Sequence, residues 1–127
     1  MPKTIIKTEL APEAVGTYSQ GVDYNGTYYF SGQIGLEAKS MEMKEDFQGQ
    51  LNQIMENIDG LLKSQDLNRE NIIKTSIFLT DLANFGLVNE AYIAFFKEPY
   101  PARSCVQVSA LPKDALVEIE VIAAKNL

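Results

Sequence analysis

The stretch "EDFQGQLNQIMENIDGLLKSQDLNRENIIKTSIFLTD", residues 45–81, decides the fold class because its hydrophobic period changes partway along. Its first part has apolar residues at three- and four-residue steps with Gln, Asn, Glu and Asp between them, which predicts an amphipathic helix over about residues 44–64. The apolar positions are Phe47, Leu51, Ile54, Met55, Ile58, Leu61 and Leu62. The β-branched segment 71–81 then predicts a strand that ends in Asp81, a good N-cap for another helix.

The segments on either side continue this alternation of helix and strand. Downstream, a second helix is expected with the apolar face Leu82, Phe85, Val88, Tyr92, Phe95 and Phe96, and the prolines of "EPYP", residues 98–101, end it. Two strands follow, over about residues 103–108 and 116–124. Upstream, the turn dipeptide Asn25-Gly26 predicts a hairpin with arms at 19–24 and 27–35, and residues 4–9 are a candidate edge strand.

This order of elements predicts one α+β domain over residues 1–127, with two helices on one face of the sheet. The other face of the sheet also needs a cover. In a chain of this size the cover is expected to be another copy of the chain, which indicates an oligomer.

Composition and charge limit the classes of function that are possible for this chain. The chain has 46% hydrophobic and 22% charged residues, as soluble globular proteins do, and its net charge of -6 weighs against binding to nucleic acid. No apolar run approaches the ~20 residues of a membrane span, and "MPKTIIKTEL" lacks the features of a signal peptide. We therefore expect no membrane partner and a cytoplasmic location, with which the lone Cys105 agrees.

The chain has no histidine and one cysteine, which excludes Ser-His and Cys-His nucleophiles and thiolate metal sites. Composition leaves a carboxylate-only magnesium or calcium site as an alternative, but no spacing resembles an EF-hand loop, and "SGQIG" is not a nucleotide-binding loop. We therefore expect neither a metal nor a cofactor. An enzyme of this composition is limited to Arg, Tyr, Glu, Asp, Lys, Ser and backbone groups, which favours a substrate that is already electrophilic.

Arg103, in "PARSCVQV", is an unexpected charge in a strand. If the last two strands pair so that their apolar faces match, Cys105 lies opposite Glu118, and Arg103 becomes a diagonal neighbour of Glu118 at about 7–8 Å. A small anion fits between such a pair. The same register places Glu120 opposite Arg103, so the strands alone leave an anion site and a plain ion pair as alternatives.

The segment "PARSCVQVSALPKDALVEIE", residues 101–120, resembles the C-terminal signature of the RidA family, formerly the YjgF group. Further blocks resemble the family in the same order, among them "APEAVGTYSQGV", "YFSGQIGL", "IKTSIFLTD" and "FGLVNEAYIAFFKEPY". The resemblance implies a chorismate-mutase-like α+β fold and a homotrimer with sites at the subunit interfaces. It also implies hydrolysis of 2-imino acids, such as 2-iminobutanoate and 2-iminopropanoate, to 2-keto acids and ammonia without a metal or cofactor.

The resemblance also implies roles for individual residues. Arg103 matches the arginine that binds the substrate carboxylate, Glu118 the acid that positions or activates water, and Tyr18 a tyrosine near the imine. Ser31 and Gly32 match the loop that lines the pocket, Asn89 an asparagine that shapes it, and Cys105 a residue that meets the substrate through its backbone; Phe85, at the start of the second helix, is the aromatic candidate. A 2-imino acid needs little beyond a cation for its carboxylate and an acid-base group for water.

Two positions depart from the family pattern: Thr17 stands where proline is frequent, and Met41 where glycine is frequent in a turn. Two other functions are weighed against the deaminase. One is a non-catalytic ligand-binding or regulatory protein of the same fold, for which retention of Glu118 would be unnecessary. The other, an RNA-acting protein, is the weakest because of the acidic composition.

Overall fold

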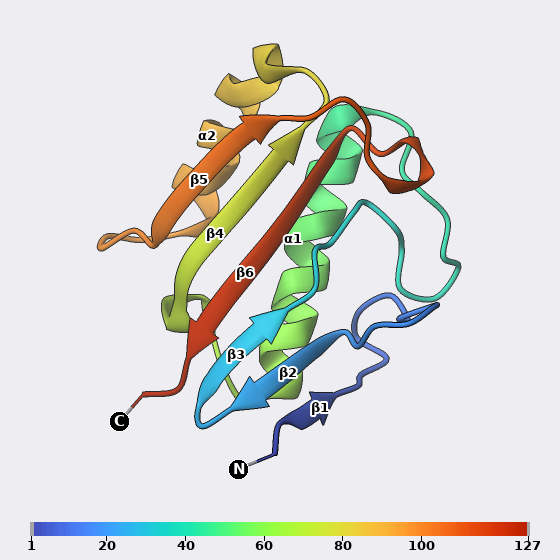
Figure 1. Cartoon of the computed structure of the whole chain (residues 1–127). Coiled ribbons are helices and arrows are strands. Elements are labelled where there is room, and N and C mark those ends of the chain that lie inside the picture. The colour runs from blue at the N-terminus through green and yellow to red at the C-terminus, as the bar shows by residue number, and fades with distance from the viewer. Residues whose placement is uncertain (1, 127) are drawn as a thin grey trace.

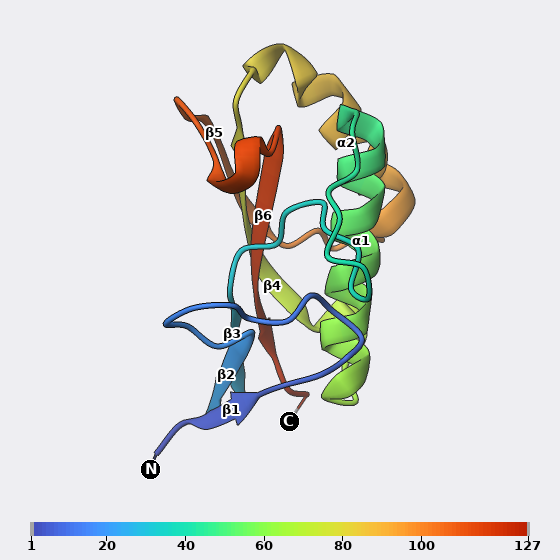
Figure 2. The same ribbon diagram turned by 90° about the vertical axis from the view of Figure 1, so that its right-hand side faces the viewer.

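Six strands form one mixed sheet in the computed structural model, which describes residues 2–126. The strands are β1 (Thr4–Ile6), β2 (Gly21–Tyr24), β3 (Thr27–Phe30), β4 (Ile72–Leu79), β5 (Ala102–Gln107) and β6 (Val117–Ala124), and the helices are α1 (Phe47–Ser64) and α2 (Phe85–Phe95). The strand order is β1-β2-β3-β6-β4-β5 (Figure 1). Figure 2 shows both helices against the same face of the sheet, as the sequence predicts.

Helix α1 supplies much of the core. The carboxylate of Asp46 accepts a hydrogen bond from the backbone N–H of Gly49 at 2.8 Å, so the helix begins at Phe47, slightly later than its hydrophobic pattern suggests. Its apolar stripe is buried against the sheet: Leu51, Ile54 and Leu61 are each 0% exposed. The predicted hairpin is also present, with positive φ angles of 53° at Asn25 and 86° at Gly26.

Asp81 caps a different helix from the one expected. Its carboxylate accepts from the backbone N–H of Ala83 at 2.9 Å, which starts a short 3-10 helix, Leu82–Asn84, and α2 follows directly at Phe85. The sequence pattern merged these two helices because both are rich in apolar residues.

The predicted pairing of the last two strands is wrong. β4 lies between them, parallel to β5 and antiparallel to β6. The reason lies in burial: β4 and β6 bury alternate residues along most of their length, whereas β5 is exposed along most of its length and therefore suits the edge of the sheet. The connection from β5 to β6 consequently passes across the end of β4 (Figure 1).

Within residues 2–126 no helix covers the second face of the sheet, here called the open face (Figure 2). Its exposed apolar side chains include Ile5, Tyr29 and Val106, which are 52%, 47% and 48% exposed. No helix in the described part of the chain is long and apolar enough to cross a membrane.

Candidate functional site

Arg103 lies on edge strand β5 and points toward α2. Its Nη1 donates a hydrogen bond to Oδ1 of Asn89 at 2.7 Å. Its Cζ lies 5.1 Å from the ring centroid of Phe85 and 5.0 Å from that of Tyr92, both within cation–π range. Arg103 is an exposed residue, but one hydrogen bond and two aromatic rings fix the position of its guanidinium.

The helical spacing explains this arrangement. Phe85, Asn89 and Tyr92 are four and three residues apart, so they share the face of α2 that lies over the sheet. Tyr92 is anchored in turn by a hydrogen bond between its hydroxyl and that of Thr75, on β4.

The ion-pair alternative for Arg103 is not observed. The ion pairs among residues 2–126 are Lys44–Glu37 and Arg69–Asp59, and neither includes Arg103. Glu120 lies on β6, with β4 between it and β5, and it pairs in register with Ser76 rather than with Arg103. The guanidinium thus retains N–H groups that can bind an anion.

Cys105 follows two residues later on β5 and is half-buried. Burial raises the pKa of its thiol, and the nearby Arg103 charge only partly opposes this effect. Cys105 is therefore a neutral thiol near pH 7, which argues against a nucleophilic role for its sulfur.

Glu118 lies on β6 and is half-buried on the open face. Its carboxylate packs against Gly32: a Cβ at that position would lie 2.8 Å from Cδ of Glu118 and would also clash with Oε2. Burial raises the pKa of the Glu118 carboxyl, and the negative charge of Glu120 raises it further. A carboxylate with a raised pKa is a better proton acceptor than an ordinary one.

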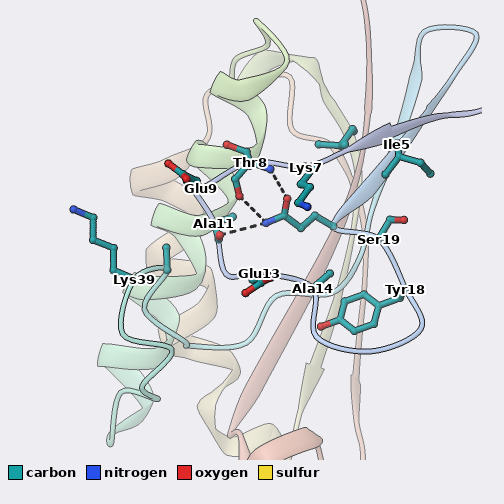
Figure 3. A pocket seen from close by; sticks show the side chains of 13 residues that line it. Ile5, Lys7, Thr8, Glu9, Ala11, Glu13, Ala14, Tyr18, Ser19 and Lys39 are labelled. Atoms are coloured by element: carbon teal, nitrogen blue, oxygen red, sulfur yellow. Dashed lines mark hydrogen bonds between the residues drawn. The ribbon is translucent and has the colours of Figure 1, made fainter.

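Ser31 connects Gly32 to the loop that carries Tyr18. The Ser31 hydroxyl donates to the carbonyl oxygen of Ser19 at 2.6 Å, and the Ser31 backbone N–H donates to that of Gln20 at 2.9 Å. Tyr18 is 56% exposed, and it lines a cavity of about 790 Å³ (Figure 3).

Gln20 holds this loop in place from inside. It is 4% exposed, and its Nε2 donates to the carbonyl oxygens of Thr8, Ala11 and Pro12 at 2.9, 3.2 and 2.8 Å. Its Oε1 accepts from the backbone N–H of Thr8 at 2.7 Å. Figure 3 draws hydrogen bonds of this amide as dashed lines beside Thr8 and Ala11.

The candidate residues therefore form two groups. The Arg103 group consists of Phe85, Asn89, Arg103 and Cys105, and the Glu118 group consists of Ser31, Gly32 and Glu118 with the Tyr18 loop attached. Two cavities of about 790 and 820 Å³ in the described part of the chain are lined by neither Arg103 nor Glu118. Within residues 2–126 no cluster of three His, Cys, Asp or Glu side chains is arranged as a metal site.

The expected diagonal contact between Arg103 and Glu118 is absent from the described structure, because the two side chains lie on opposite faces of the sheet. Arg103 is in register with Thr75, which points to α2, and Glu118 is in register with Phe78, three residues later and therefore on the open face. In addition, β5 and β6 are two strand spacings apart, roughly 9–10 Å. A small substrate cannot touch both groups of one chain.

Sequence reasoning left Tyr92, Thr75 and Glu120 out of the site. The apolar pattern of the second helix predicts Tyr92 in the core, where its ring lies, but the ring also faces Arg103. One signal was available: Asn89 interrupts the apolar face of the second helix, which marks that face as lining something polar. The effect of Glu120 on Glu118 depends on their two-residue spacing along β6, which puts both on the open face.

The family model described as "Endoribonuclease L-PSP" matches residues 8–125. The 2-iminobutanoate/2-iminopropanoate deaminase of Salmonella typhimurium is 44% identical over 129 residues, covering 99% of this chain and 100% of the relative.

Solved structures agree with this match. RidA from an Antarctic Psychrobacter is 44% identical with a TM-score of 0.93, covering 96% of this chain and 99% of that one. Escherichia coli TdcF with bound serine is 43% identical with a TM-score of 0.91, covering 97% of this chain and 99% of that one. These structures confirm the expected α+β, chorismate-mutase-like fold. By sequence and by fold, the chain belongs to the RidA (YjgF) family, whose members include 2-iminobutanoate/2-iminopropanoate deaminases.

Proposed function

We propose that this protein hydrolyses 2-imino acids, such as 2-iminobutanoate and 2-iminopropanoate, to 2-keto acids and ammonia. The observation that carries the proposal is the pair of complementary groups: a guanidinium with N–H groups left for a carboxylate, and a half-buried glutamate with a raised pKa. The 44% identity to a Salmonella deaminase, over 99% of this chain and 100% of the relative, supports it. The proposed reaction requires no metal and no cofactor. We also propose a cytoplasmic location, with which the lone Cys105 agrees.

The proposed site is shared between copies of the chain in a homotrimer. Arg103 and Glu118 lie on opposite faces of the sheet, so a second copy is needed to bring the Arg103 group of one chain to the Glu118 group of another. The exposed β5 and the apolar open face are surfaces that such a copy would bury. The TdcF structure with bound serine shows a relative of this fold holding a small amino acid.

In the proposed reaction, Arg103 grips the substrate carboxylate with two parallel N–H bonds. The Glu118 carboxylate removes a proton from a water molecule whose oxygen attacks the C=N carbon, and the nitrogen takes up a proton to give a carbinolamine. The carbinolamine hydroxyl then loses its proton, the C–N bond breaks, and the nitrogen leaves with a further proton as ammonia. Tyr18 and the backbone groups of Gly32 and Cys105 are proposed to border the reacting atoms.

A coupled trapping assay tests the proposal. A threonine dehydratase and threonine generate 2-iminobutanoate, and semicarbazide traps the imine that remains. The protein should lower the trapped fraction, whereas Arg103→Ala and Glu118→Gln should not. Glu70→Gln, an exposed glutamate on the 3-10 helix Arg69–Asn71, is the matched control and should act as the wild type does.

The assay also separates the alternatives. If the wild type leaves the trapped fraction unchanged, the deaminase proposal is wrong for this substrate. A wild type that binds 2-oxobutanoate through Arg103 without lowering the trapped imine would be a non-catalytic binding protein instead.

A further inference from the structure

Two buried residues beside Arg103, Thr75 and Tyr92, have no role in the proposed reaction. We infer that Thr75 and Tyr92 are positioning residues for Arg103, because their hydroxyl–hydroxyl hydrogen bond fixes the aromatic wall against which the guanidinium lies. The inference rests on the proposed function in one respect, namely that Arg103 binds the substrate carboxylate.

Both hydroxyls are buried. Thr75 is 1% exposed and lies on β4, and Tyr92 is 5% exposed and lies on α2. Their side-chain oxygens are hydrogen-bonded to each other, which links the sheet directly to the helix. Buried hydroxyls need partners, so this bond restricts the position of the Tyr92 ring.

The same threonine also fixes the backbone of Arg103. Thr75 and Arg103 are register partners in the parallel β4–β5 pair. The backbone of Arg103 is therefore aligned with that of Thr75. The Cζ of Arg103 lies 5.0 Å from the centroid of the Tyr92 ring, whose hydroxyl is hydrogen-bonded to the same threonine. Asn89, three residues before Tyr92 on α2, accepts from Nη1 at 2.7 Å and completes the support.

Packing alone does not account for the two hydroxyls. The Tyr92 ring already packs against Phe96 with a centroid distance of 4.8 Å, and a phenylalanine would keep that contact. A pair of hydroxyls in an apolar core adds little stability over apolar groups of the same shape. What the pair adds is a fixed ring orientation beside Arg103.

Arginine side-chain NMR provides a direct test, because Arg69 and Arg103 are the arginines of the chain. Arg69 is an internal control: its guanidinium binds Asp59 at 2.9 and 2.7 Å and lies 3.9 Å from the Phe95 ring, so these contacts include neither Thr75 nor Tyr92. The variants are Thr75→Val, Tyr92→Phe, the double variant, and Thr75→Ser, which keeps the hydroxyl.

In Thr75→Val and Tyr92→Phe, the Nε–H signal of Arg103 should shift and its relaxation should show greater mobility, while that of Arg69 stays unchanged. The affinity for 2-oxobutanoate should fall roughly tenfold, the effect of about one ordinary hydrogen bond. In the deaminase assay KM should rise in proportion with kcat nearly constant, because Glu118 lies in the other group. Thr75→Ser should restore all these properties.

The double variant separates positioning from packing. If the single variants are weak only because they leave one hydroxyl unpaired, removal of both hydroxyls should restore 2-oxobutanoate binding. If the bond orients the ring, the double variant stays weak.

Three results overturn the inference: wild-type affinity in both single variants, a shifted Arg103 signal with unchanged affinity, or recovery in the double variant. Failure of the proposed function is distinguishable. If the wild type binds 2-oxobutanoate, the variants bind it more weakly as expected, and no imine is hydrolysed, the proposed function is wrong but the inference stands. If the wild type does not bind 2-oxobutanoate, Arg103 does not bind a carboxylate and the inference is wrong too.

Discussion

At the scale of single residues, the proposed chemistry depends on the surroundings of two charges. Arg103 is ordered by a helix face, which leaves its charge available on an exposed strand. Glu118 is half-buried beside a second carboxylate, which makes it a stronger base than an exposed glutamate. The residue types were readable from the sequence, but their surroundings were not, because those depend on which strand lies beside which.

Glu120 should set part of the pH dependence of activity. The pKa of Glu118 is raised above its ordinary 4.5, first by burial and then by the charge of Glu120. A base must be unprotonated, so kcat/KM should rise with pH through this raised pKa. Glu120→Gln removes the like charge and should move the acid limb to lower pH, though burial keeps it above 4.5.

The pH profile of kcat/KM measures this shift, with Glu70→Gln as the control that leaves the limb in place. Stability has the opposite sign. The folded state favours the protonated carboxyl, so the contribution of Glu118 to the free energy of unfolding is largest below pH 4.5 and is lost as pH rises through the raised pKa. An acid limb that stays in place or moves to higher pH in Glu120→Gln would contradict the assigned role of Glu120.

Gly32 should be required for the position of the Glu118 carboxylate. The Cβ of Gly32→Ala would meet the end of a flexible side chain, so Glu118 is expected to rotate away at little cost in stability. We expect kcat to fall by roughly tenfold to a hundredfold, as for loss of general-base catalysis. Thermal unfolding should be nearly unchanged, and equal losses of activity and stability would show that the glycine serves the fold instead.

At the scale of elements, the parts with strong local signals were predicted. Helix α1 has a long apolar stripe, and the β2–β3 hairpin has an Asn-Gly turn; both are observed. The order of β4, β5 and β6 was missed because alternation along a strand fixes its faces but not its neighbours. That error placed Arg103 and Glu118 on the same face when they are on opposite ones.

Met41 marks a turn that is strained by its side chain. Its φ is 60°, in the left-handed region, and its N–H donates to the carbonyl oxygen of Glu37 at 2.9 Å. A residue with a side chain in this conformation lowers the free energy of unfolding by roughly 1–2 kcal/mol relative to one without strain. Glycine avoids this strain but lowers the free energy of unfolding by about 0.5–1 kcal/mol through the greater entropy of the unfolded chain. Met41→Gly should therefore stabilise the protein by about 0.5–1 kcal/mol, measured by urea unfolding. Met41→Ala, which keeps a Cβ, is the control and should not gain; equal stability of the glycine and wild-type proteins would mean that the turn relaxes the strain by itself.

At the scale of the whole molecule, the two sheet faces have different roles. One face carries both helices and the core, and the open face carries exposed apolar residues beside Glu118 (Figure 2). The sequence indicated that this face needs a cover, because its two helices are expected on the other face and a chain of this size has no further element to cover it. The mutual arrangement of the copies was not derivable from the chain's pattern, since it depends on surface shape.

A site shared between two chains predicts that mixed oligomers of two inactive variants regain activity, whereas a site within one chain does not. Arg103→Ala and Glu118→Gln are each expected to be inactive alone. In equimolar mixed oligomers, a site formed by Arg103 of a Glu118→Gln chain and Glu118 of an Arg103→Ala chain contains both wild-type groups. For a ring in which every site takes one group from each neighbour, random mixing makes about a quarter of the sites complete. Activity should therefore return to about a quarter of the wild-type value after subunit exchange, and not when the two variants are merely combined without exchange. Light scattering should give a mass of three chains, and verified mixed oligomers with no regained activity would place the two groups in separate sites.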